Sequence, residues 1–137
     1  QIRSSILKVA RYNVFELTEA MLAGDLARLN RMLDGLKGEG EPLVLILWSV
    51  TEELRILSKL KAASDAGESV QNLMRANRIW GNKERLYPAA LRRVQPLKLR
   101  RAMQVAAGLD RQVKGLHAAD LPADPWDGLR LVGNLLR

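Results

Sequence analysis

The chain has 137 residues, a formal net charge of +7 and a pI of about 10.2, and 47% of its residues are hydrophobic. This length fits one domain, and the apolar content excludes a disordered chain. The absence of cysteine excludes disulfides and thiolate metal sites. The longest apolar run, residues 43–48, is far shorter than the ~20 residues of a membrane span, so we expect no contact to the membrane. No charged n-region followed by an apolar h-region occurs, so we expect a cytoplasmic protein. The chain begins at Gln1 without a secretion signal, so we interpret it as a fragment of a longer protein.

Helix start and stop signals recur along the chain, whereas no strand pattern of useful length occurs. Asn13, three residues before Glu16, forms a capping-box pattern and predicts a helix over about residues 14–23 that ends at Gly24. Asp25 is expected to cap the next helix, whose apolar residues recur at three- and four-residue spacing up to a glycine-rich turn.

The strongest predicted helix begins at Pro42, because proline is favoured where a helix starts. Residues 43–48 are all apolar, so we expect the first turns to be buried on every side, with Trp48 in the core. Farther along, one apolar stripe remains, and charged side chains such as Glu52 and Glu53 are expected to face solvent.

The second half of the chain shows three further helical segments after a short helix near residues 69–76. Asn82 is expected to cap a segment that runs toward Tyr87, and Pro88 to restart a helical turn. A long helix is expected to begin at Pro96, with Leu97 and six later residues on its apolar side.

A polar loop over residues 115–125 and a last helix capped by Asp124 complete the pattern. The sequence therefore predicts an all-α fold, a compact bundle of six or seven helices formed by residues 13–137. Residues 1–12 are interpreted as a lead-in from a preceding domain.

No residue pattern points to catalysis, to a metal or to a cofactor. His117 is the only histidine, and zinc needs three or four convergent ligands. Glu52 and Glu53 point about 100° apart on a helix and cannot act as a catalytic pair. Neither a GxxxxGK[ST] nor a GxGxxG phosphate loop occurs. These residues alone predict a helical interaction domain with no catalytic site and no cofactor.

Two features leave alternatives open. Residues 75–114 contain eleven Lys or Arg against Glu84 and Asp110, which is typical either of a solvated basic surface or of one that faces acidic partners. Trp80 lies within this stretch; we favour packing against the helices for it, while stacking on a nucleic-acid base is the alternative. Trp126 is expected to anchor a loop against the bundle.

Several ordered motifs resemble the third domain of the delta subunits of bacterial DNA polymerase III clamp loaders. They are VARYNVFEL at 9–17, EAMLAGD at 19–25, LKGEGEP at 36–42, the run into Trp48 with Glu52-Glu53-Leu54, RIWGNK at 78–83 and LRRA at 99–102. Together they span nearly the whole chain in the order found in that family.

The resemblance implies a bacterial, cytoplasmic protein whose helical collar domain follows two AAA+-shaped domains and packs with the other clamp-loader subunits, gamma/tau and delta prime. It also implies that the sliding clamp is bound by an N-terminal domain that these residues do not contain. The subunit has no working ATP site, so the chain would support loading of the clamp onto primed DNA through assembly of the loader.

In this family the collar closes one end of the chamber that holds primer–template DNA. We therefore hypothesise that Arg111, Lys114 and His117 face the DNA, where phosphate contacts would add affinity without sequence preference. The alternative is an autonomous, basic, helical nucleic-acid-binding module, although the sequence has no clear helix-turn-helix or RNA-binding signature. A small helical enzyme has no residues to support it.

Overall fold

A computed structural model describes residues 13–118 and 120–137, and within them the chain forms seven α-helices and no strand. The helices are α2 (Val14–Ala23), α3 (Leu26–Gly38), α4 (Leu43–Asp65), α5 (Val70–Ala76), α6 (Asn82–Arg93), α7 (Pro96–Val113) and α8 (Pro125–Leu136). The all-α prediction of six or seven helices is confirmed. The predicted lead-in over residues 1–12 lies outside the described residues.

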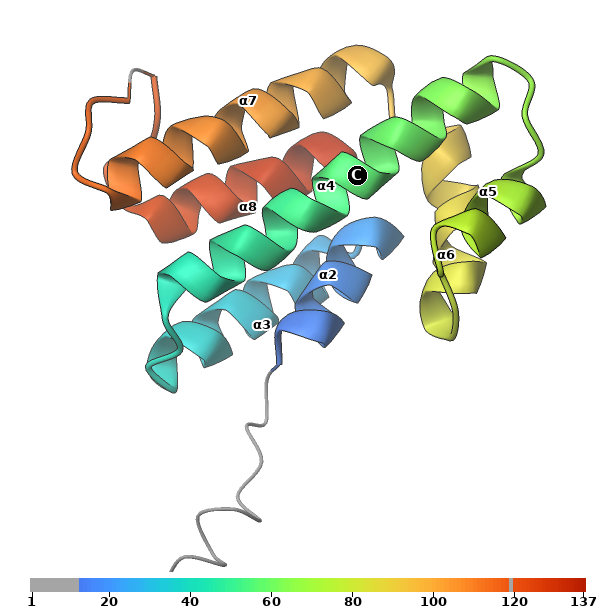
Figure 1. The fold of residues 1–137 in the computed structure, drawn as a ribbon. Helices are drawn as coiled ribbons and strands as arrows, with labels where there is room; N and C mark the ends of the chain where they lie inside the picture. The colour runs from blue at the N-terminus through green and yellow to red at the C-terminus, as the bar shows by residue number, and fades with distance from the viewer. Residues whose placement is uncertain (1–12, 119) are drawn as a thin grey trace, which may run out of the picture.

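The longest helix, α4, crosses the middle of the molecule (Figure 1). It contacts α2 on one side and α7 on the other, while α5 and α6 pack near its C-terminal end. The last helix, α8, lies along α7 and also contacts α2 and α3, which closes the bundle. None of the described helices is both long and apolar enough to cross a membrane.

The predicted caps start three of the helices. The Asn13 side chain accepts a hydrogen bond from the Glu16 amide at 2.8 Å, Asp25 from the Arg28 amide at 3.0 Å, and Asp124 from the Trp126 amide at 2.9 Å. Each cap satisfies an amide that would otherwise lack a partner in the first helical turn.

Gly24 ends α2 in the left-handed conformation, with φ of 70°. A side chain is strained in that conformation, and one at this position would also approach the Arg93 guanidinium to 3.1 Å. Glycine therefore serves both the turn and the packing here.

The prediction of an interruption before Pro88 was wrong. Helix α6 begins at Asn82 with Gly81 as its N-cap, and it continues through Pro88 to Arg93. Proline removes one helical hydrogen bond. The helix nevertheless continues, because Tyr87, Ala90 and Leu91 are buried against the bundle on both sides of the proline.

The prediction that the first turns of α4 are buried on every side was also wrong. Ile46 and Leu47 are in the core, but Val44 and Leu45 are exposed, and 65% of Trp48 is exposed. Leu97, expected on the apolar side of α7, is 74% exposed. Trp126 is partly buried against the core, as expected for an anchor. Hydrophobic residues thus remain on the surface at both ends of the α4–α7 pair.

Candidate interaction surface

Apolar side chains gather on the surface formed by the first turns of α2 and α4. We call this surface the Trp48 face and define it by its exposed members, Phe15, Val44, Leu45 and Trp48. Val44 and Trp48 are four residues apart on α4 and therefore lie on the same side of that helix. Large apolar groups gathered on a surface mark sites where proteins or ligands bind.

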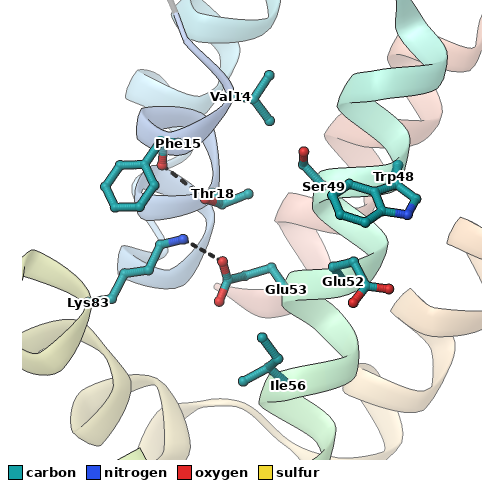
Figure 2. A pocket seen from close by; sticks show the side chains of 9 residues that line it. All are labelled: Val14, Phe15, Thr18, Trp48, Ser49, Glu52, Glu53, Ile56 and Lys83. Atoms are coloured by element: carbon teal, nitrogen blue, oxygen red, sulfur yellow. Dashed lines mark hydrogen bonds and ion pairs between the residues drawn. The ribbon is translucent and has the colours of Figure 1, made fainter. Parts of the chain in front are cut away.

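A groove of about 270 Å³ lies between α2 and α4 at this face (Figure 2). Phe15 from α2 and Trp48 from α4 stand on opposite sides of it, and Glu53 lies between them. The lining residues are Val14, Phe15, Thr18, Trp48, Ser49, Glu52, Glu53, Ile56 and Lys83.

A second hollow, of about 280 Å³, lies on the α7 side of Trp48. It is lined by α4 residues that include Val44 and Trp48, and by Ala106 and Asp110 of α7. The Trp48 indole therefore forms a wall shared by two depressions, and a partner could contact it from either side.

A buried polar network supports the groove. Glu53 is 7% exposed, so the prediction that it faces solvent was wrong. Its carboxylate accepts a hydrogen bond from the Tyr87 hydroxyl and pairs with Lys83 at 2.6 Å, which joins α4 to α6. The Lys83 ammonium also lies 4.4 Å from the centre of the Phe15 ring, a cation–π distance. The network thus fixes one wall of the groove.

The environment of Tyr87 alters its acidity. Burial raises the pKa of the Tyr87 hydroxyl far above its usual range, and the adjacent Glu53 carboxylate raises it further by its negative charge and its hydrogen bond. The phenol therefore remains a hydrogen-bond donor at every physiological pH.

Charged side chains that line the two depressions form ion pairs. Arg55 pairs with Glu52 at 2.6 Å, and Asp110 pairs with Lys114 at 2.9 Å. These pairs are substantially exposed, so each contributes little to stability and remains available to a partner.

The three residues predicted to face DNA lie at and beyond the end of α7. Arg111, Lys114 and His117 are all exposed. Lys114 is engaged with Asp110, and no hydrogen bond between the three side chains occurs in the described part of the chain. The three residues are close in sequence, but their side chains do not form a connected binding site.

Trp80 is 70% exposed, so the interpretation that it packs between helices was wrong. It lies in the turn between α5 and α6, where Arg78 adopts the left-handed backbone conformation with φ of 55°. Of the eleven cations in residues 75–114, nine are exposed, while Lys83 and Arg93 are partly buried. Trp80 and the exposed Arg78 therefore lie in the same turn.

Arg93 has a structural role, unlike the exposed cations. It donates hydrogen bonds to the carbonyl oxygens of Leu22 at 2.8 Å and Leu136 at 3.2 Å, at the ends of α2 and α8. Burial lowers the pKa of this guanidinium, although arginine stays charged in proteins.

Sequence patterns missed the most prominent features of this surface. Phe15 lies two residues after the Asn13 cap, and that position on the first turn of α2 was the only signal for its exposure. The Glu53–Lys83 pair joins residues thirty positions apart, which no local pattern reveals. Within the described ranges, no three His, Cys, Asp or Glu side chains are placed to hold a metal ion.

Comparison with known proteins shows which family the chain belongs to. It is 27% identical over 132 residues to DNA polymerase III subunit delta of Escherichia coli (strain K12), and the match covers 96% of this chain and 38% of that protein. The chain thus spans well under half the length of this relative. Residues 14–130 match the family described as processivity clamp loader gamma complex DNA pol III C-term. The helical bundle agrees with the resemblance found in the sequence motifs. The chain belongs to this family of clamp-loader C-terminal domains.

Proposed function

We propose that this chain is the assembly domain of a clamp-loader delta subunit, which holds the subunit in the loader while the sliding clamp is placed on primed DNA. The family membership supports this function, and the observation that carries it is the exposed Trp48 face. Exposure of Trp48, Leu45 and Phe15 to water is unfavourable, and a partner that covers these side chains would remove that cost.

The partners we propose are the gamma/tau and delta prime subunits. In this proposal the protein works in the cytoplasm, and the sliding clamp is bound by a preceding AAA+-type region outside residues 13–137. The domain has no catalytic role of its own; it contributes to polymerase action only by association.

Reconstitution tests the proposal. The purified domain, shown to be folded by its helical circular dichroism, is mixed with the other clamp-loader subunits and analysed by size-exclusion chromatography with light scattering. We expect one copy of the domain to enter each complex. A folded domain that stays separate from these subunits would contradict the assembly function.

The second candidate is direct binding of nucleic acid, and the exposure of Trp80 favours it. Base stacking on an aromatic ring together with phosphate contacts from arginine is how many proteins bind single strands. The predicted DNA-facing group, Arg111, Lys114 and His117, belongs to this candidate as well. It is compatible with the first function if the assembled loader brings these residues toward the template.

Neutralisation of the predicted group tests the second candidate. We expect a triple variant, Arg111→Gln, Lys114→Gln and His117→Gln, to weaken binding of primed DNA by the assembled loader and to reduce its salt dependence. Unchanged binding and an unchanged salt slope would exclude these residues as DNA contacts. Tight binding by the isolated domain, in contrast, would favour an autonomous nucleic-acid module.

A further inference from the structure

We propose that the groove between Phe15 and Trp48 receives an amphipathic helix of a neighbouring clamp-loader subunit, one whose apolar side chain is flanked by lysine or arginine. This inference rests on the proposed assembly function and specifies the kind of partner that occupies the Trp48 face.

The shape of the groove fits a helix better than a small molecule. Its volume of about 270 Å³ is just below the range of typical ligand pockets, and α2 and α4 line it on opposite sides, with Lys83 of α6 reaching into it. Val44 and Trp48 form a ridge along α4; Trp48 lines both depressions, and Val44 lines the one toward α7. Ridges of this kind pack into the grooves of a second helix.

The charges around Trp48 favour a basic partner. Three carboxylates, of Glu52, Glu53 and Asp110, line the two depressions against two cations, Arg55 and Lys83. Both cations are already held by carboxylates at 2.6 Å. Asp110 is likewise paired, with Lys114 at 2.9 Å. Because these pairs leave no unpaired positive charge along the depressions, a lysine or arginine beside the incoming apolar residue can approach the partly exposed carboxylates of Glu52 and Asp110.

The distribution of charge along the chain also favours a basic partner for this face. Residues 13–68, which include α2, α3 and α4, contain ten acidic and six basic residues, whereas residues 69–114 contain two acidic and eleven basic residues. The Trp48 face thus belongs to the acidic half of a basic protein. This disfavours a nucleic acid as the occupant, because phosphates would meet carboxylates there.

A second copy of this chain fits less well. A symmetric dimer through this face would use the same patch on both protomers, so that the carboxylates of Glu52, Glu53 and Asp110 would enter the interface twice. Like charges across an interface oppose association. A neighbour of different sequence avoids this conflict.

Site-specific photo-crosslinking in the reconstituted loader identifies the occupant. Trp48 is replaced by p-benzoylphenylalanine in the full-length subunit that carries this domain, and crosslinked peptides are mapped by mass spectrometry. We expect crosslinks to a helix of another subunit in which lysine or arginine flanks the attached apolar residue. Crosslinks to a second copy, to DNA or to another part of the same chain would overturn the proposal.

Binding measurements with matched controls complete the test. We expect Trp48→Ala to weaken incorporation of the subunit by about thirtyfold or more, as for an aromatic hot spot, and Glu52→Lys to weaken it as well. The matched variants are Leu97→Ala, which removes an equally exposed apolar group outside the groove, and Lys59→Glu, which reverses an exposed charge of α4 that does not line it. Equal losses from the groove variants and their controls would overturn the proposal.

Failure of this inference can be distinguished from failure of the proposed function. If the unmodified subunit assembles and Trp48→Ala assembles equally well, the domain holds the loader together through another surface. If the folded, unmodified domain does not assemble at all, the proposed function itself is wrong. Because Trp48 is mostly exposed, its replacement should leave the thermal unfolding of the domain nearly unchanged, which circular dichroism checks.

Discussion

At the scale of single residues, the hydrogen bond from Tyr87 to Glu53 leads to a prediction about how stability depends on pH. The folded state keeps the Tyr87 proton, because burial and the carboxylate raise its pKa, whereas the unfolded chain releases it near pH 10. Stability from this group is therefore complete below pH 10 and falls as the pH rises further. We expect the free energy of unfolding to decrease by up to about 1.4 kcal/mol per pH unit from this proton alone.

The variant Tyr87→Phe isolates this contribution. Loss of the hydroxyl leaves Glu53 with one buried partner fewer, which should cost about 1–3 kcal/mol in urea unfolding at pH 7. The difference between the two proteins should then shrink as the pH rises above 10. A constant difference up to pH 11.5 would mean that the phenol ionises in the folded protein as easily as in the unfolded chain.

At the scale of helices, α6 is attached to the bundle by polar contacts at several points along its length. Glu53 holds Lys83 and Tyr87, Lys61 donates to the Leu91 carbonyl at 2.7 Å, and Arg93 reaches the ends of α2 and α8. These contacts accompany a buried apolar stripe that Pro88 does not interrupt.

Replacement of Arg93 by methionine tests this attachment. Methionine keeps much of the apolar stem but leaves the carbonyls of Leu22 and Leu136 without their charged donor, so we expect a loss of about 1.5–3 kcal/mol in stability. The neighbouring Arg92 is exposed, and Arg92→Met should change stability by less than about 0.5 kcal/mol. Similar effects in urea unfolding of the two variants would refute a special role for Arg93.

A second prediction at this scale concerns the close packing of α8. A methyl group on Gly133 would collide with the Leu29 side chain of α3, whereas Gly38 has open space around it. We expect Gly133→Ala to destabilise the domain by about 1–3 kcal/mol, since overpacking forces side chains to shift. Gly38→Ala serves as the control. If thermal unfolding shows no loss for Gly133→Ala, then Leu29 moves aside without cost.

Most helix boundaries, though not the continuation of α6 through Pro88, could be predicted from sequence because their determinants are local. The Asn13, Asp25 and Asp124 side chains cap the amides of residues two or three positions ahead. The surface could not be predicted in the same way. Hydrophobicity marks Trp48 as a residue that avoids water, but it does not tell whether the covering comes from the same chain or from another protein. The buried position of Glu53 depends on Lys83 and Tyr87 of another helix, which only the tertiary structure brings close.

At the scale of the whole molecule, the two exposed tryptophans belong to different surfaces. Trp48 lies in an acidic and apolar setting, whereas Trp80 lies in the basic stretch between residues 75 and 114. If the two proposals are both correct, their effects should separate. We expect Trp48→Ala to reduce incorporation into the loader with little effect on DNA affinity per assembled complex.

The reciprocal variant should behave in the opposite way. Trp80→Ala is expected to leave incorporation unchanged and to weaken binding of the assembled loader to single-stranded template by about 1–3 kcal/mol, the cost of one lost stacking interaction. Fluorescence anisotropy of a labelled primed template measures this affinity. If Trp80→Ala impairs assembly and leaves DNA binding intact, Trp80 belongs to a second subunit interface.

The distribution of the tryptophans also has a spectroscopic consequence. Two of the three indoles, Trp48 and Trp80, are mostly in water in the folded domain, and Trp126 is only partly buried. Intrinsic fluorescence should therefore change little when the domain unfolds, although a buried indole usually makes it a sensitive probe of folding. The same emission should shift to the blue when a partner covers Trp48, so the unlabelled protein can report its own association.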